Sequence, residues 1–311
     1  MNGKPYLELE AVGVRFGSVC ALRGATLTVS PGDLLALVGP DGAGKTTLLR
    51  VMVGLALPTS GRVAHYLARD RVGFCGADFD LYGDLTVQEN LSFFGSVRGM
   101  SRAELARAAG RLLKLVGLTE ARDRLAAQLS CGMKKKLSLA AALIHDPALL
   151  LLDEPTVGVD PGSRRELWDI VAQANAWGAA VVYTTPYLDE AERARRVVVL
   201  GDGEVRDTSP MDLMRNAAGW KAWLVPLDGS RREVRLRLAQ AALGPRVYLR
   251  PEGLAVLART EGEAVGLVAA VLADGLSQPD LVPGALTLED AFVLAQGIDL
   301  GGVGASEEGG S

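Results

Sequence analysis

Apolar and polar residues alternate along this chain in patterns that predict short strands and amphipathic helices. Leu34–Val38 and Leu149–Leu152 are unbroken apolar runs, and runs this short are typical of strands buried on both faces. Shorter or alternating patterns predict further strands at Tyr6–Ala11, Val12–Phe16, Ala25–Val29, Arg71–Phe74 and Ala179–Thr185. The chain therefore belongs to the α/β class if helices connect these strands.

Helical periodicity follows the first strands. Asp84–Arg98 has apolar residues at helical spacing, and so does Ala103–Val116. Ser101 and Glu104 form a capping-box pattern before the second helix, and Gly117 is placed to end it. We therefore predict a mostly helical segment over residues 84–129, inserted between strands of the first domain.

The composition changes near Asp207, and the pattern predicts a second, smaller α/β domain. The expected elements are helices at Pro210–Asn216 and Glu261–Leu272 and strands at Lys221–Leu227 and Val247–Arg250. The predicted division is a first domain over residues 1–206, a small domain over 207–297 and a flexible tail over 298–311. We favour a packing extension over a ligand sensor as the role of the small domain.

Composition and charge exclude several classes of protein. The chain has 311 residues and a net charge of −4, with no basic tract of the kind that nucleic-acid-binding proteins carry. Its three cysteines are scattered, which argues against a disulfide framework and favours a reducing compartment. The start is unlike a signal peptide, and apolar runs such as Ala264–Ala273 fall short of the roughly 20 residues of a membrane helix. We expect a chain that is soluble by itself and reaches a membrane only through a partner.

The candidate chemistry begins directly after the Leu34–Val38 strand. Residues 39–46 match the pattern G-x-x-x-x-G-K-[ST], followed by helical residues from Thr47. In this motif glycines let backbone amides face phosphate, the lysine (Lys45) reaches the β- and γ-phosphates, and the hydroxyl of Thr46 holds Mg²⁺. The positive end of the helix adds attraction for an anion. The predicted phosphate-binding residues are Gly39, Pro40, Asp41, Gly42, Ala43, Gly44, Lys45, Thr46 and Thr47.

Two adjacent carboxylates, Asp153 and Glu154, end the Leu149–Leu152 strand. Asp153 is suited to hold the water shell of Mg²⁺, and Glu154 is suited to polarise an attacking water. Phe16 precedes the phosphate-loop strand and could stack on a nucleotide base. The alternative for Phe16 is an ordinary core side chain.

A third motif carries a specific family resemblance. Residues 129–133, LSCGM, resemble LSGGQ, the signature of ATP-binding cassette (ABC) proteins, and VGVDP follows the acidic pair as in that family. The chain from Leu7 to Val205 resembles an ABC nucleotide-binding domain. This resemblance implies a P-loop NTPase with a RecA-like core, an inserted helical subdomain and, here, a small C-terminal α/β appendage. It also implies ATP and Mg²⁺ as cofactors.

The resemblance further implies roles for individual residues. Two cassettes would pack head to tail around two ATP molecules, with Phe16 stacking on adenine. Ser130, Cys131 and Gly132 would face the γ-phosphate held by the opposite cassette. A serine, a glycine and a helix N-terminus also form an anion-binding nest on physical grounds alone. The lysines Lys134, Lys135 and Lys136 are most simply a solvated helix face.

Two departures from the family pattern concern hydrolysis. Ala77 stands where the family has a glutamine, and Pro186 stands where it has a histidine. Neither His65 nor His145 can replace that histidine in register. Loss of one preorganised donor to a transition state costs on the order of 10²–10³ in rate. We predict intact nucleotide binding and weakened, though not abolished, hydrolysis, since Glu154 is present.

The closest resemblance is to ATP-binding subunits of drug-type exporters with a small permease, as the degenerate first cassette of a pair. It implies two partners at the cytoplasmic face of the cell membrane, an integral membrane permease and a second, non-identical cassette. The permease would contact residues 77–98. Two alternatives stay open: a soluble ABC protein acting on the ribosome or chromosome, and a nucleotide-dependent regulator without turnover. We expect no nucleic-acid partner, because the balance of charge is acidic.

Overall fold

The chain forms two compact units, Met1–Ser209 and Pro210–Ser311. The computed structural model describes residues 4–201, 203–226, 246–250, 253–271 and 281–297. The predicted tail over residues 298–311 lies outside the described residues. No helix in these described ranges is long and apolar enough to cross a membrane.

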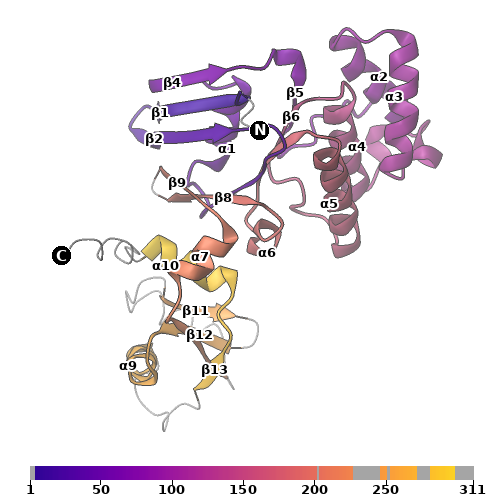
Figure 1. The fold of residues 1–311 in the computed structure, drawn as a ribbon. Coiled ribbons are helices and arrows are strands. Elements are labelled where there is room, and N and C mark those ends of the chain that lie inside the picture. The colour runs from indigo at the N-terminus through magenta and orange to yellow at the C-terminus, as the bar shows by residue number, and fades with distance from the viewer. Residues whose placement is uncertain (1–3, 202, 227–245, 251–252, 272–280, 298–311) are drawn as a thin grey trace, which may run out of the picture. The chain divides into compact units, whose positions relative to one another are not determined.

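The first unit is built on a six-stranded sheet (Figure 1). The strand order is β5 (Val72–Cys75), β6 (Leu149–Leu152), β7 (Ala180–Thr184), β3 (Leu34–Val38), β8 (Arg196–Gly201) and β9 (Glu204–Thr208). Neighbouring strands from β5 to β8 are parallel, and β9 is antiparallel to β8. Parallel strands place their carboxyl ends at one edge of a sheet, so the loops after β3, β6 and β7 meet there.

A second sheet in this unit is antiparallel, in the order β2 (Val19–Val29), β1 (Leu7–Phe16) and β4 (Ser60–His65). The sequence pattern predicts two segments in place of β1, whereas the structure has one strand. Its register against β2 shifts around Val12, and Ala11 has a φ of 48°. Such a bulge interrupts the polar–apolar alternation without ending the strand.

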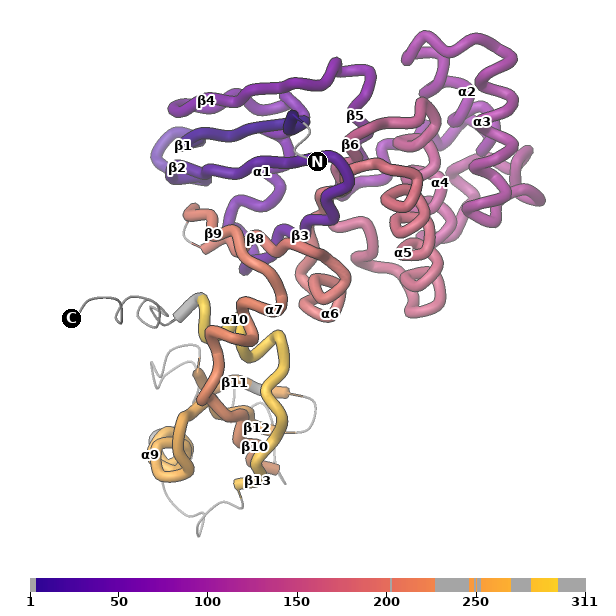
Figure 2. Tube along the Cα trace, in the orientation of Figure 1, coloured from indigo at the N-terminus to yellow at the C-terminus, as the bar shows by residue number. Residues whose placement is uncertain are grey.

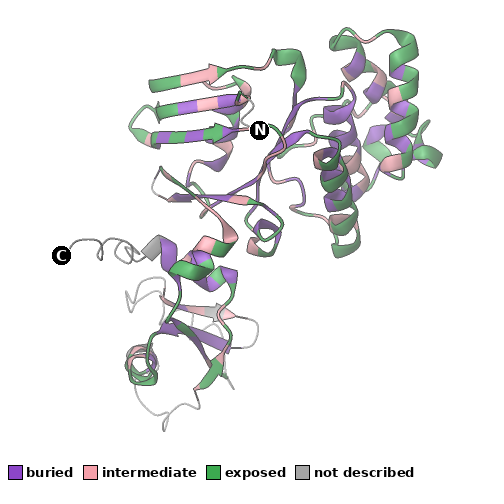
Figure 3. Ribbon diagram, viewed as in Figure 1, coloured by how far each residue is buried: buried purple, intermediate pink, exposed green. Residues whose placement is uncertain are grey.

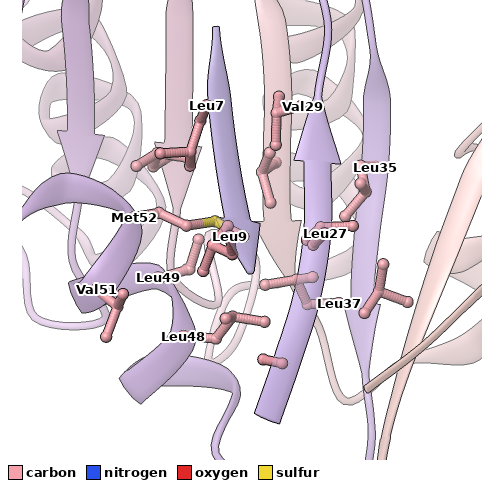
Figure 4. Close-up of a cluster of buried hydrophobic side chains, with 14 of the residues drawn as sticks. Leu7, Leu9, Leu27, Val29, Leu35, Leu37, Leu48, Leu49, Val51 and Met52 are labelled. Atoms are coloured by element: carbon pink, nitrogen blue, oxygen red, sulfur yellow. The ribbon is translucent and has the colours of Figure 1, made fainter. Parts of the chain in front are cut away.

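Helix α1 (Lys45–Val53) packs between the two sheets and joins them into one core. Leu48, Leu49 and Met52 are fully buried. Figure 4 shows Leu49 and Met52 beside Leu9 of β1, with Leu48 in the same cluster. This packing fixes the start of α1 directly after the carboxyl end of β3.

The predicted helical segment lies away from the three-stranded sheet, as Figure 2 shows. It contains α2 (Val87–Val97) and α3 (Arg102–Leu115), which pack on each other and on α4 (Cys131–Leu143). The predicted Ser101–Glu104 capping box is confirmed, and Thr86 with Glu89 forms a second one before α2. The outer faces of these helices are exposed, whereas the central strands β3, β6 and β7 of the six-stranded sheet are buried (Figure 3). The remaining elements of the unit are α5 (Pro161–Ala176), α6 (Leu188–Ala191) and the 3₁₀ turns Arg69–Arg71, Thr119–Ala121 and Ala126–Gln128.

The second unit contains an antiparallel sheet in the order β11 (Val247–Arg250), β12 (Gly253–Ala258), β10 (Lys221–Val225) and β13 (Val282–Gly284). Helix α9 (Glu261–Val271) packs on β12, and α7 (Pro210–Asn216) packs on α10 (Leu288–Gly297). The pattern did not predict β12, because its residues GLAVLA are buried throughout and do not alternate.

Candidate nucleotide site

The loop from Gly39 to Gly44 curls between β3 and α1. Gly42 and Gly44 have φ values of 79° and 99°, a region that favours glycine. A Cβ on Gly44 would also lie 2.5 Å from the carbonyl oxygen of Ala21. Lys45 is only 6% exposed, and its ammonium donates to the carbonyls of Gly39 (2.8 Å) and Pro40 (3.0 Å). The loop therefore holds a cation inside its curl, as a phosphate-binding loop requires.

Three oxygen-bearing side chains converge beside this loop. The hydroxyl of Thr46 donates to Oδ1 of Asp153 at 3.2 Å, and the hydroxyl of Thr184 donates to the same oxygen at 2.7 Å. Asp153 is 2% exposed. Since β7 lies between β3 and β6, Thr184 at its end bridges the two motifs. Hydroxyl and carboxylate oxygens are ligands that Mg²⁺ prefers, so Thr46 and Asp153 fit this ion.

Glu154 adopts an unusual backbone conformation, with a φ of 48°. Such a conformation costs a non-glycine residue about 1–3 kcal/mol and persists only where surrounding contacts impose it. Here both backbone groups are held: the amide donates to the Thr184 hydroxyl at 2.8 Å, and the carbonyl accepts from Lys135 at 3.2 Å and from the Val157 amide at 3.3 Å. Thr184 and Lys135 are therefore the two side chains that hold the Glu154 backbone, and the Val157 amide adds a third hydrogen bond.

The expectation that Lys134–Lys136 form a solvated face is wrong for Lys135. This side chain is 5% exposed, and its ammonium donates to the carbonyl of Ala77 at 2.8 Å as well as to that of Glu154. Lys135 lies one turn into α4, on the side that packs against β5. Lys134 and Lys136 are half-buried, and Lys136 pairs with Glu166.

The signature residues form the start of α4. Ser130 is the N-cap, and its hydroxyl accepts from the Met133 amide at 3.3 Å. Ser130 and Cys131 are exposed, and the Cys131 thiol donates to the Gly158 carbonyl at 3.3 Å. A Cβ on Gly132 would lie 2.5 Å from Oγ of Ser163, so this position needs glycine. The structure therefore presents the Ser130 end of α4 at the surface.

Asp160, in the loop after the acidic pair, is the N-cap of α5. Its carboxylate accepts from the Ser163 amide at 2.9 Å. That backbone hydrogen bond lowers the pKa of Asp160. The carboxylate is therefore engaged within its own chain.

The two departures from the family pattern lie in exposed loops. Ala77 is exposed, and its carbonyl is anchored by Lys135. Pro186 is exposed between Thr185 and Tyr187, where it offers neither an amide hydrogen nor a polar side chain. No polar side chain is therefore contributed to the site from either position.

A buried carboxylate holds the loop around Pro186. Glu190 is 1% exposed and accepts from the hydroxyls of Thr156 (2.7 Å) and Thr185 (2.5 Å). Arg164 of α5 pairs with it at 3.2 Å. Sequence reasoning missed this cluster and also Thr184, although a polar residue at the end of a buried strand is a signal for the latter.

Phe16 is 58% exposed at the end of β1. The core alternative for this residue is therefore wrong. An exposed ring is available for stacking, and its role on adenine stays a prediction.

Comparison with known proteins adds to this geometry. Residues 22–157 match the ABC transporter family. The daunorubicin/doxorubicin resistance ATP-binding protein DrrA of Streptomyces peucetius is 33% identical over 280 residues, which cover 86% of this chain and 85% of DrrA. The chain belongs to the ABC transporter family, as an ATP-binding cassette. The predicted fold class, a P-loop NTPase of ABC type, is thereby confirmed.

Other relatives of this cassette agree. The probable multidrug ABC transporter ATP-binding protein YbhF of Escherichia coli is 37% identical over 295 residues. These cover 90% of this chain but 49% of YbhF, so the chain spans about half the length of that relative. A dimeric ATP-binding cassette in a post-hydrolysis state, bound to ADP and Pi, superposes with a TM-score of 0.60 at 27% identity, covering 65% of this chain and 98% of that one.

Proposed function

We propose that this cassette is the ATP-binding subunit of a membrane exporter. ATP closes a pair of cassettes, and hydrolysis resets them. The observation that carries the proposal is the cluster of Lys45, Thr46 and Asp153 at the carboxyl edge of the sheet, with Thr184 joining them. It supplies a cation and oxygen ligands in the places that a magnesium–triphosphate complex requires.

Binding depends on the loop and on the helix behind it. Lys45 exchanges its loop carbonyls for the β- and γ-phosphate oxygens, while backbone amides of residues 39–47 face the phosphate chain. Thr46 and Asp153 hold the metal, and Phe16 covers the base. Mg²⁺ held by Thr46 and Asp153 would supply positive charge that offsets the negative charge developing on the phosphates during transfer.

Glu154 is the group that polarises water in this proposal, and it acts without the two side chains that the family provides at Ala77 and Pro186. Neither Ala77 nor Pro186 offers a side-chain donor to the water or to the γ-phosphate, and Pro186 also has no backbone N–H. The effects on rate of residues that act as one unit are not additive. The reduction in hydrolysis rate is therefore smaller than the product of the reductions that each missing side chain would cause alone. We expect slow hydrolysis at this site and ordinary affinity for ATP.

The partners follow from the surfaces at the site. Ser130 and Cys131 are exposed at the start of α4, with Gly132 buried behind them, and this helix end would complete the site of a second cassette. The permease would dock on residues 77–98. There Tyr82 and Phe93 are exposed with their ring centroids 4.5 Å apart, and Val97 at the end of α2 is exposed as well. Solvent-exposed aromatic side chains of this kind favour an apolar partner segment.

Export is favoured over the alternatives by the relatives, which include a Nod factor export protein of Paraburkholderia xenovorans that is 36% identical over 224 residues. A location at the cytoplasmic face of the membrane follows from this proposal. A regulator without turnover stays the second candidate, because Ala77 and Pro186 weaken the hydrolytic site.

The test is ATP turnover by the purified full chain beside Lys45→Ala and Pro186→His. Slow turnover that rises with Pro186→His and disappears with Lys45→Ala is expected. Fast turnover that Pro186→His leaves unchanged would refute the weakened site. Turnover that survives Lys45→Ala would place hydrolysis elsewhere.

A further inference from the structure

The ammonium of Lys135 is buried between two loops of the nucleotide site. It donates to the carbonyl of Ala77 at 2.8 Å and to the carbonyl of Glu154 at 3.2 Å. The first carbonyl belongs to the loop that lacks the family's glutamine. The second belongs to the residue that polarises water in the proposed mechanism. One side chain therefore ties both loops to α4.

The contact with Glu154 is the more consequential one, because the Glu154 backbone is strained. Its φ of 48° needs contacts that hold it. Thr184 holds the amide, whereas the carbonyl accepts from Lys135 and from the Val157 amide at 3.3 Å. Removal of Lys135 would release the one side-chain restraint on the Glu154 carbonyl, leave the Val157 amide there, and let the Glu154 carboxylate turn away from its productive direction without touching the phosphate loop.

Lys135 belongs to α4, the helix that begins at the signature residues 129–133. Lys135 lies one turn after the Ser130 N-cap of α4, whose exposed end is proposed to meet the nucleotide of the opposite cassette. A shift of that helix end would therefore reach Glu154 of the same chain through a single side chain.

We propose that Lys135 is a positioning residue for hydrolysis, which orients Glu154 and couples it to the signature helix. In this proposal Lys135 also anchors the loop at Ala77 through the Ala77 carbonyl and acts without touching the nucleotide. This inference rests on the proposed ATPase function and deepens it.

The experiment compares Lys135→Met, Lys135→Arg and Lys114→Met in the full chain. Lys114→Met is the matched control, since Lys114 is an exposed lysine on α3. Steady-state kinetics with ATP and Mg²⁺ give kcat and KM. Hydrogen exchange of peptides that contain Ala77 and Glu154 is measured in the same samples and needs no turnover.

For Lys135→Met we expect kcat to fall roughly 10- to 100-fold, the range for loss of a charged hydrogen bond, while KM changes less than about twofold. Exchange at both peptides should rise. Lys135→Arg, which keeps the cation and its donors, should restore most of kcat and of the protection, and Lys114→Met should match the parent.

An unchanged kcat, a KM that rises as kcat falls, or unchanged exchange at the Glu154 peptide would overturn the proposal. If Lys135→Met does not fold, Lys135→Gln takes its place against Lys135→Arg. Failure of the proposed ATPase function itself is distinguishable, because the parent chain would then show no turnover above Lys45→Ala, while the exchange measurement still decides whether Lys135 holds Glu154.

Discussion

Thr184→Val is the most informative single change in the site, because it removes one hydroxyl and keeps the shape of the side chain. That hydroxyl is fully buried, donates to Asp153 at 2.7 Å and accepts from the Glu154 amide at 2.8 Å. After the change Asp153 keeps the Thr46 hydroxyl at 3.2 Å. The Glu154 amide, in contrast, loses the acceptor that the structure gives it.

The magnitude follows from these two bonds. A hydrogen bond to a charged group contributes about 1.5–3 kcal/mol, and a buried amide left unsatisfied costs about 1–3 kcal/mol. The two effects share one hydroxyl and do not add fully. We therefore expect Thr184→Val to lower the stability of the β3–β6–β7 region by about 2–4 kcal/mol.

Native-state hydrogen exchange of peptides from β3, β6 and β7 measures this free energy directly. Thr184→Ser keeps the hydroxyl and loses a methyl group, so it should cost only about 1 kcal/mol. Thr28→Val, on an exposed strand position, should change stability by less than about 0.5 kcal/mol. If Thr184→Val costs no more than Thr184→Ser, the bridging role of the hydroxyl is refuted.

Three further predictions concern other parts of the chain. Asp290 is fully buried and accepts from Arg250, Tyr248 and the Thr287 amide (2.6 Å). Asp290→Ala should therefore destabilise the second unit by about 3–5 kcal/mol in urea unfolding. A loss of stability under about 1 kcal/mol would contradict this pairing. Burial, and next Arg98, lowers the pKa of His145 from 6.5 to about 4. As the pH falls, the unfolded chain binds the proton before the folded chain does. The free energy of unfolding should therefore fall by about 1–2 kcal/mol, after a discount for solvent screening, between pH 6.5 and about 4. His145→Gln should reduce this dependence of stability on pH in urea titrations, and an unchanged dependence would contradict the prediction. In a Glu154→Gln background, ATP should slow alkylation of the exposed Cys131 thiol if cassettes close over it, whereas equal rates with and without ATP would argue against closure.

The sequence predicts those parts of the fold that local pattern determines. β3 and β6 have the predicted bounds, because an apolar run that is buried on both faces leaves no ambiguity about its ends. Strand β12 is also a buried apolar run, but the pattern did not predict it. Its sequence lies beside a segment of helical pattern, and an apolar run there can be either a helix or a strand. The division into functional domains at residues 1–206 and 207–297 stays a prediction. Strand β9 runs to Thr208, two residues beyond the predicted boundary.

The sequence predicts the motifs of the site but not the contacts that support them. Lys45, Thr46 and Asp153 lie together as motif spacing suggests. Lys135 and Glu190 instead depend on tertiary packing, because each lies in a polar stretch of sequence but is buried against partners that are distant in the chain: Ala77 for Lys135, and Thr156 and Arg164 for Glu190. Periodicity carries no information about such contacts.

Calorimetric titration of the full chain with ATP and Mg²⁺ tests the central claim most directly. We predict saturable binding that Lys45→Ala weakens at least about tenfold, through loss of a charged contact with phosphate, and that Pro186→His leaves unchanged. Absence of binding, or equal affinity in the parent and Lys45→Ala, would contradict the assignment of residues 39–47 as the nucleotide site.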